Sequence, residues 1–368
     1  MKNQISFTGL AHAAIVLTFT IALMYVAKSI LVPIAFAMFF SFLLYPACKF
    51  LERKLPPVIA ILLTFFTVIL ILAGIGFFFG TQFYSLFENI KNFGANISIS
   101  IEKLLNFLEN SILHKGNLNL DNPEKLVNPV DVIQGTISTS TGFLVGFGLI
   151  FIYTFLFLFY RGSFKKLILY HFTEKEKENV KEVLTTIQKV AQNYFFGVMI
   201  VILIVGTLNG LGLWAMGLDY PFLFGYFAAF LAIIPYIGTF IGGLLPALYA
   251  LVNEQNMWLA FFVVVWYIVI QTLEGNILTP KIVGSKVSLN PLIALIALLT
   301  GGLIWGIAGM VLFIPFMAIL KVIFDSIEPL KPYGLLLGSD FGSKEFTIVR
   351  KKAVPKINQK IGKKSDSK

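Results

Sequence analysis

Charged residues are scarce in this chain. Aspartate, glutamate, lysine and arginine together make up 13% of its 368 residues, whereas a soluble domain carries about 25%. Hydrophobic residues make up 57%, of which many are aromatic. A chain of this composition cannot cover its surface with polar groups in water, which excludes a soluble globular protein. Because lipid solvates apolar faces directly, the composition predicts a protein of the bilayer.

Cysteine and histidine are nearly absent as well. Cys48 is the single cysteine, which excludes a disulfide within the chain. The three histidines are scattered and lack the paired spacing of metal ligands. The sequence holds no phosphate-binding loop of the pattern G-x-x-x-x-G-K-[S/T], and no histidine placed to serve a serine or cysteine nucleophile. We therefore expect no metal, no cofactor and no enzymatic activity.

Long apolar blocks are what the chain does contain. Each block is roughly 20 residues long, the length of a helix that crosses about 30 Å of hydrocarbon. Strands of a membrane barrel would be about 10 residues long and would alternate apolar with polar residues. The sequence predicts an all-α, polytopic transmembrane protein with about eight membrane segments. We expect one ordinary span at 9–27 and, after a turn at Lys28 and Pro33, a second that ends at about residue 47. Four further ordinary spans are expected at 58–80, 142–160, 193–217 and 257–273.

Polar residues divide the chain into regions. Residues 81–141 mix polar and apolar positions with helical spacing, which predicts an extramembrane helical insert. Thr173 and Glu176 form a capping-box pattern, and the apolar face that follows predicts an amphipathic helix that continues into the next span. The expected organisation is N-terminal transmembrane helices at 1–80, the insert at 81–141, a transport core at 142–350 with the amphipathic helix at 173–192, and a basic tail at 351–368.

The net charge of +10 lies mainly in short loops and in the tail. Clusters at Lys49 to Lys54 and Arg161 to Lys166 belong on the cytoplasmic side by the positive-inside rule. This orientation places both termini in the cytoplasm and the insert outside. The distribution favours a lipid bilayer, not nucleic acid, as the partner of the basic residues. The apolar faces of the extramembrane helices also favour a homo-oligomer.

Two segments in the final third are broken by proline and glycine. Residues 221–251 and 291–324 each begin with proline, are interrupted near the middle and contain a later proline, Pro246 or Pro315. Each is either a helical hairpin or a broken full span, and the combination of proline with glycine favours hairpins. Paired interrupted segments of this kind indicate the binding site of a transporter.

The candidate path residues come from these breaks and from the polar stretch between them. Glu274 ends an apolar run, and a carboxyl group inside a membrane favours its protonated form, which suits proton coupling. The alternative is that Glu274 lies in water at the cytoplasmic interface. The glycines either free backbone groups for a solute or allow close helix packing. The full candidate set is Pro235, Tyr236, Gly238, Gly242, Gly243, Gln271, Glu274, Asn276, Pro280, Asn290, Gly302 and Gly306.

The positions of Asn209 and Asn290 in the sequence indicate a role for each side chain. Asn209 lies within the 193–217 span, between the glycines of Gly206-xxx-Gly210, and is expected to bond across helices in preference to lining a path. Asn290 precedes Pro291 and is most simply a turn or helix-start residue.

The segments IPYIGTFIGGLLPAL (234–248) and EGNILTPKIVGSKVSLNPLIALIALLTGGLIWGIAGMVLFIPFMAIL (274–320) resemble the signature region of the autoinducer-2 exporter family of permeases. The resemblance extends weakly over the whole chain. It implies a protein of the bacterial inner membrane that exports a small solute, with autoinducer-2 export and sodium–proton antiport both associated with the family. Thr239 stands where members commonly have proline, and Asn290 where a histidine often occurs, which weakens a proton-coupled role for position 290.

The sequence leaves three functions open. A secondary transporter would use an ion gradient or the gradient of its solute, since no ATP-binding motif occurs. A passive pore would show neither saturation nor counterflow. A membrane scaffold would bind a partner through its extramembrane helices and transport nothing.

Overall fold

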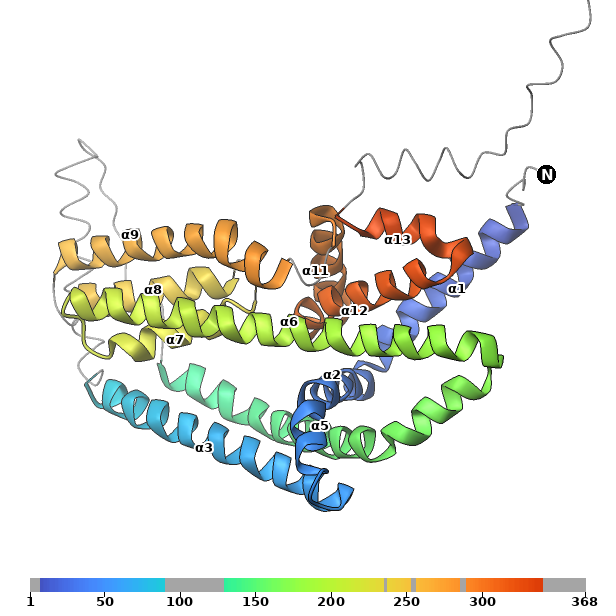
Figure 1. Cartoon of the computed structure of the whole chain (residues 1–368). Helices are drawn as coiled ribbons and strands as arrows, with labels where there is room; N and C mark the ends of the chain where they lie inside the picture. The colour runs from blue at the N-terminus through green and yellow to red at the C-terminus, as the bar shows by residue number, and fades with distance from the viewer. Residues whose placement is uncertain (1–6, 90–128, 235–236, 253–255, 285–288, 340–368) are drawn as a thin grey trace, which may run out of the picture.

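The computed structural model describes residues 7–89, 129–234, 237–252, 256–284 and 289–339, and these residues are almost entirely helical (Figure 1). The helices are α1 (Phe7–Val26), α2 (Lys28–Leu51), α3 (Pro57–Asn89), α5 (Pro129–Tyr170), α6 (Glu174–Ala215), α7 (Pro221–Leu231), α8 (Ile237–Val252), α9 (Met257–Leu273), α11 (Pro291–Trp305), α12 (Ile307–Ser326) and α13 (Lys331–Leu337).

Six helical segments of the described chain are long and apolar enough to cross a membrane. Shorter apolar helices accompany them, among them α7, α8 and α11. The prediction of a polytopic all-α membrane protein is therefore confirmed. The six segments are Lys28–Leu51, Pro57–Leu86, Gly146–Tyr170, Glu174–Ala215, Met257–Gly284 and Ile307–Ser326.

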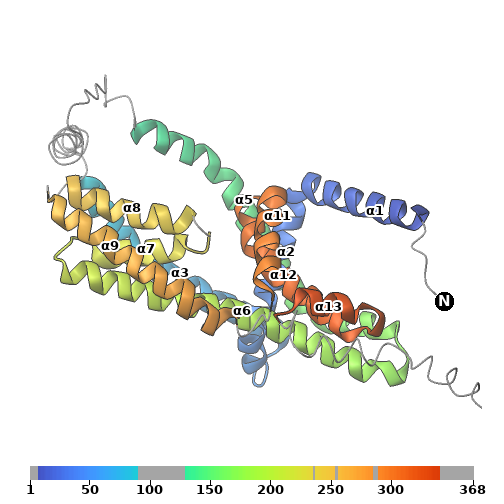
Figure 2. The same cartoon turned by 90° about the horizontal axis from the view of Figure 1, so that it is seen from above.

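α6 is the axis of the molecule. It runs unbroken for 42 residues, with α7 and α9 packed along its C-terminal half and α2 and α12 along its N-terminal half, while α8 packs on α7 and α9 (Figures 1 and 2). Its start is fixed by the predicted capping box, because the backbone N–H of Thr173 donates to Glu176 Oε2 at 3.0 Å. The amphipathic segment and the membrane span are thus one continuous helix, as the sequence predicted.

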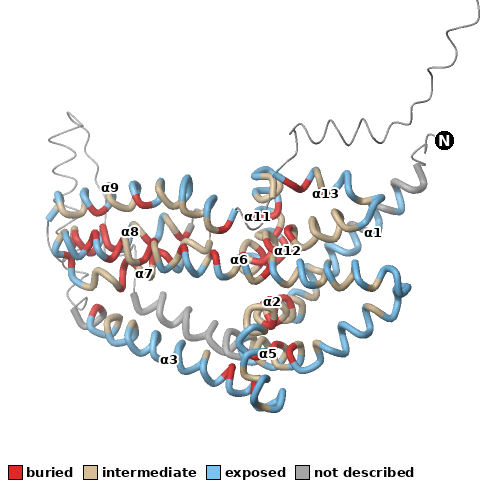
Figure 3. Tube along the Cα trace, viewed as in Figure 1, coloured by how far each residue is buried: buried red, intermediate tan, exposed pale blue. Residues whose placement is uncertain are grey.

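Apolar side chains are exposed over much of the surface, most evidently along α3 (Figure 3). Phe77 of α3 is 77% exposed and Leu303 of α11 is 81% exposed. Large apolar patches are rare on soluble monomers. In a bilayer the same faces contact hydrocarbon, so the exposure agrees with a membrane protein and needs no aqueous partner.

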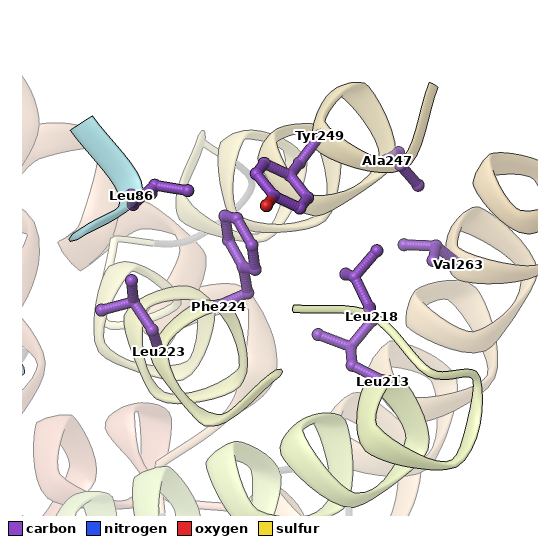
Figure 4. Close-up of a cluster of buried hydrophobic side chains, with 9 residues drawn as sticks. Leu86, Leu213, Leu218, Leu223, Phe224, Ala247, Tyr249 and Val263 are labelled. Atoms are coloured by element: carbon purple, nitrogen blue, oxygen red, sulfur yellow. The ribbon is translucent and has the colours of Figure 1, made fainter. Parts of the chain in front are cut away.

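Buried apolar side chains form separate clusters where helices meet. One cluster lies between α7, α8 and α9, and includes Leu223, Phe224, Tyr249 and Val263 (Figure 4). A second joins α6 to α7, α9 and α12, and a third joins α2 to α11 and α12. These contacts hold the C-terminal half together around α6.

One prediction about the N-terminal half is wrong in detail. Lys28 and Pro33 do not bound a turn, because α2 begins at Lys28 and continues through Pro33, and the break lies at Ala27. Membrane helices tolerate an internal proline when neighbouring groups satisfy the freed backbone.

The expected insert at 81–141 falls largely outside the described residues. Its first residues extend α3 to Asn89, and its last residues, from Pro129, begin α5. The basic tail at 351–368 also lies outside the described residues. The extramembrane character of both segments stays a prediction.

Candidate transport site

α7 lies in a glycine groove on α6. A Cβ at Gly206 would come within 2.4 Å of the Tyr226 ring, and one at Gly210 within 2.5 Å of the Phe222 ring. A Cβ at Gly225 would come within 2.5 Å of the backbone nitrogen of Gly210. The glycines of Gly206-xxx-Gly210 therefore allow the α7 backbone to touch α6.

The segment 221–251 is a helical hairpin. α7 and α8 pack side by side, and a Cβ at Gly238 would lie 1.6 Å from the carbonyl oxygen of Leu231. A Cβ at Gly242 would lie 2.6 Å from the Cβ of Ala228. Both glycines therefore allow α7 and α8 to pack closely against each other. With 11 residues, α7 rises about 16 Å, roughly half of the hydrocarbon thickness.

The turn of this hairpin follows α7 directly. Pro235 and Tyr236, predicted to form the break, lie outside the described residues. Gly243 lies on α8 with its α-carbon toward the Tyr267 side chain of α9, where a Cβ would meet the ring at 3.3 Å. The first hairpin is thereby held between α6 and α9.

The segment 291–324 is a second hairpin, formed by α11 and α12. It turns at Gly306, whose φ of 62° and ψ of −141° lie in a region that residues with a Cβ rarely adopt. Near the turn, Gly302 faces the end of the Met310 side chain, at 2.8 Å from an ideal Cβ. The Trp305 indole N–H donates to the carbonyl oxygen of Met24 at 3.0 Å, which ties the turn to α1.

Both hairpins reach the middle of α6. Ala229 of the first hairpin and Ala318 of the second belong to one buried cluster, which also contains Tyr194 and Val201 of α6. Ile270 of α9 and Val283 complete that cluster. The structure thus brings together on one helix the two interrupted segments that the sequence singled out.

Glu274 lies where α9 ends and the helix widens. Residues Glu274–Leu278 and Pro280–Gly284 form π-helical turns, which in other proteins often mark functional sites. Pro280, one of the candidates, opens the second of these turns. The widened backbone leaves α9 and packs Ile282 and Val283 against Gly197 of α6.

The Glu274 carboxylate is half-buried and both of its oxygens are hydrogen-bonded. Gln271 Nε2 donates to Oε2 at 2.9 Å, and the Thr279 hydroxyl donates to Oε1. The structure therefore brings Gln271 and Glu274 together as polar neighbours. Thr279 was not predicted, and its only signal in the sequence is its position before Pro280.

The two asparagines of this region lie apart from the carboxylate. The exposed Asn276 donates from Nδ2 to the Thr272 carbonyl oxygen at 2.9 Å, a bond within its own helix. Asn290 caps α11, because its Oδ1 accepts from the Leu292 backbone N–H at 3.0 Å. The interpretation of Asn290 as a helix-start residue is confirmed.

Asn209 does not show the predicted bond across helices. It is 3% exposed, and its Oδ1 is buried without a hydrogen-bond partner in the described structure. Nearby hydroxyls are bonded, with Thr207 and Tyr226 paired at 2.8 Å between α6 and α7. Tyr267 of α9 donates to the Phe224 carbonyl oxygen at 3.3 Å.

These features define a class of protein. It is a polytopic helical membrane protein in which two helical hairpins meet on one long helix, beside a carboxylate at the end of a neighbouring span. The sequence model described as "AI-2E family transporter" matches residues 14–328. The chain therefore belongs to the AI-2E transporter family, which is a family of transporters and not of enzymes.

Named relatives agree with this assignment. The chain is 30% identical to "Putative transport protein YrrI" of Bacillus subtilis, over 81% of this chain and 86% of the relative. It is 25% identical to "Putative transport protein YueF" of the same organism, over 80% and 83%. It is 21% identical to "Putative transport protein YhhT" of Escherichia coli, over 85% and 89%. The similarity thus covers most of each relative.

Proposed function

We propose that this protein is a secondary transporter of the bacterial inner membrane that exports a small solute. The solute is either an autoinducer-2-like signal molecule or a monovalent cation that is exchanged for protons. The observation that carries the proposal is the meeting of both hairpins with the end of α9 on α6. Interrupted helices in corresponding positions place unpaired backbone groups within the membrane, where a solute can use them.

The solute path follows the two breaks and the polar turn after α9. Glu274 is the group proposed to carry charge or a proton, because it is the carboxylate that lies next to both the hairpin cluster and the π-helical turns. Gln271 and Thr279 hold its two oxygens and orient it. The remaining proposed path residues are Pro235, Tyr236, Gly238, Gly242, Gly243, Asn276, Pro280, Asn290, Gly302 and Gly306.

We propose the orientation in which both termini face the cytoplasm. The basic residues between α2 and α3 and those around Arg161 support it through the positive-inside rule. In this orientation the first hairpin enters from outside and the second from the cytoplasm. A homo-oligomer in the bilayer is part of the proposal, supported by the apolar faces expected on the extramembrane helices at 81–141 and 173–192.

Flux in proteoliposomes tests the function. Purified full-length protein is reconstituted in vesicles with an imposed pH or sodium gradient and a pH-sensitive dye, and parallel vesicles are loaded with autoinducer-2. Ion flux that requires the protein and an opposing gradient supports antiport. Saturable efflux of autoinducer-2 with counterflow supports a carrier for the signal molecule.

Two outcomes would contradict the proposal. Non-saturating flux without counterflow would assign a passive pore. Absence of any protein-dependent flux, in vesicles where correct folding is confirmed by a cooperative melting transition, would favour the scaffold function. A variant that lacks residues 90–128 separates a scaffold from a carrier. A scaffold that acts through the insert would lose its function completely, whereas a carrier would retain flux.

A further inference from the structure

Two basic segments that are far apart in the sequence come together where α2 packs against α5. The Arg161 guanidinium of α5 pairs with Glu52, just after the end of α2, and its Cζ lies 5.1 Å from the centre of the Tyr45 ring. Lys49 of α2 faces the same ring, with its Nζ 5.8 Å from the ring centre. One cation from each segment therefore faces a single aromatic ring, and the ion pair fixes the two segments relative to each other.

These segments form a basic patch. Its members are exposed and positively charged, namely Lys49, Arg53, Lys54, Lys165 and Lys166. Glu52 is the single acidic residue of 45–56 and 159–172, and Arg161 neutralises it. None of the five members forms an ion pair in the part of the chain that the structure describes. Because like charges on one surface repel one another, the basic patch favours a partner with negative charge.

Exposed apolar side chains border the basic patch. Phe50 is 67% exposed, and the Arg53 guanidinium lies over its ring, with Cζ 5.8 Å from the ring centre. Leu62 and Phe66 are exposed near the start of α3, which begins a few residues after Arg53. Leu167 is exposed on α5, next to the two lysines of that helix. A partner of this surface therefore meets positive charge and apolar side chains next to each other.

We propose that the basic patch is a binding site for an anionic phospholipid. The lipid phosphate is held at Lys49 and Arg53, which lie four residues apart on helical turns that continue past the end of α2. Ammonium and guanidinium groups donate charge-assisted hydrogen bonds to phosphate oxygens. The acyl chains lie along the exposed apolar side chains at the start of α3. A lipid is favoured over a soluble anion because the lipid also carries hydrocarbon for this apolar surface.

The site is more specific than a general attraction of basic loops to a membrane surface. Tyr45 and Phe50 each lie against a cation of the patch, which restricts where the two long side chains reach. Side chains that are already ordered lose less conformational freedom when they bind a ligand. The pair of Glu52 and Arg161 also holds α5 beside α2. A bound phospholipid therefore contacts α2 and α3 next to α5, and it should stabilise the folded protein.

A second copy of the chain is a poorer partner for the basic patch. The largest group of acidic residues in the described part of the chain lies at the start of α6. Two members of that group are paired within the helix, Glu174 with Lys177 and Glu178 with Lys181. Their charges are thus balanced locally, and they do not complement a patch of five unpaired cations.

Native mass spectrometry of the purified full-length protein in detergent tests lipid binding without a transport assay. The probes are phosphatidylglycerol, which is anionic, and phosphatidylcholine with the same acyl chains, which has no net charge. The patch variant carries Lys49→Gln and Arg53→Gln, and so lacks two cations of the basic patch. The control variant carries Lys175→Gln and Lys189→Gln, and so lacks two exposed lysines of α6.

The wild type should bind phosphatidylglycerol in preference to phosphatidylcholine, and the patch variant should lose this preference. Each basic residue near an anionic lipid surface changes the affinity about fivefold, so the patch variant should bind phosphatidylglycerol roughly 20-fold more weakly. The control variant should bind like the wild type. Phosphatidylglycerol should also raise the melting temperature of the wild type and the control, but not that of the patch variant. A cooperative melting transition of the patch variant shows that it is folded.

Several results would overturn the proposal. The first is that the patch variant binds phosphatidylglycerol as tightly as the wild type, and the second is that the control variant loses as much affinity. Inorganic phosphate is a third probe, and if it displaces the lipid at equal concentration the site takes a soluble anion. A patch variant that changes the mass of the assembly but not its lipid binding would assign the surface to a second copy. None of these readouts requires flux, so failure of the transport function leaves this test unaffected.

Discussion

Gly301 and Gly309 meet backbone to backbone across the α11–α12 hairpin. A Cβ at Gly309 would lie 1.9 Å from the carbonyl oxygen of Gly301, and a Cβ at Gly301 would lie 2.4 Å from that of Gly309. The contact sits a short way below the turn at Gly306. It sets how closely the two arms of the second hairpin approach, and so it sets the width of the hairpin at its tip.

Replacement of Gly309 by alanine should destabilise this hairpin. The added methyl group meets rigid backbone, and overpacking of this kind typically costs about 1–3 kcal/mol or more. The melting temperature of the purified protein should fall accordingly. Gly148→Ala is the matched control, because a Cβ at Gly148 in α5 would meet nothing within 4 Å. Equal melting temperatures for the two variants would show that the arms can separate without cost.

Replacement of Glu274 by glutamine should suppress proton-linked flux. Glutamine keeps the size of the side chain and can still accept from Thr279 or Gln271, but it cannot take up or release a proton. Flux driven by a pH gradient should fall while the melting temperature changes little. Glu328→Gln is the control, since Glu328 is an exposed carboxylate paired with Lys331. Transport that stays pH-dependent and equally fast in Glu274→Gln would exclude the coupling role.

Glu52 and Arg161 connect the end of α2 to α5. The Arg161 guanidinium pairs with Glu52 and lies 5.1 Å from the centre of the Tyr45 ring. Loss of one partner should cost roughly 1–3 kcal/mol, because the remaining group is partly desolvated and unpaired. The variant Arg161→Met should therefore melt earlier, and the double variant with Glu52→Leu should recover much of the loss.

The exposed pair of Glu178 and Lys181 is the control for that cycle. Its charges lie in water at the start of α6, and surface pairs of this kind contribute little. Lys181→Met should leave the melting temperature unchanged. If Lys181→Met lowered the melting temperature as much as Arg161→Met does, removal of a positive charge in general would account for both decreases. The pair between α2 and α5 would then have no special part in stability.

The start of α6 offers a further test. Thr173→Ala removes the hydroxyl that bonds to Glu176 at 2.7 Å and leaves the rest of the helix unaltered. Backbone amides of the first turn should then exchange hydrogen faster, because the cap no longer holds the helix start. Hydrogen exchange followed by mass spectrometry measures this change. Exchange that is unchanged in 174–178 would show that packing alone fixes the helix start.

Much of this fold could be predicted from the sequence because apolar blocks, prolines and glycines act locally. The two hairpins were predictable, since glycine interrupts each long apolar segment near its middle, and Pro235 adds a second helix-breaking residue in the first. The position at which α3 ends could not be predicted. Thr81, Ser85 and Glu88 resemble loop residues, but a helix already begun in the membrane continues through them.

The candidate site was predictable in part. Glu274 stands out because a carboxylate after an apolar run is unusual, and Gln271 lies one turn before it. Thr279 could not be found in this way. Its hydrogen bond to Glu274 depends on the widened turns after α9, which do not follow from local patterns.

The unbroken length of α6 has a mechanical consequence. A helix of 42 residues is about 63 Å long, so a tilt of about five degrees at one end displaces the other end by about 5 Å. Its N-terminal turns bear charged residues, and its C-terminal turns bear Asn209 and the groove that holds α7. A displacement of the charged end is therefore carried to the first hairpin along one continuous helix, with no break in the helix between the two.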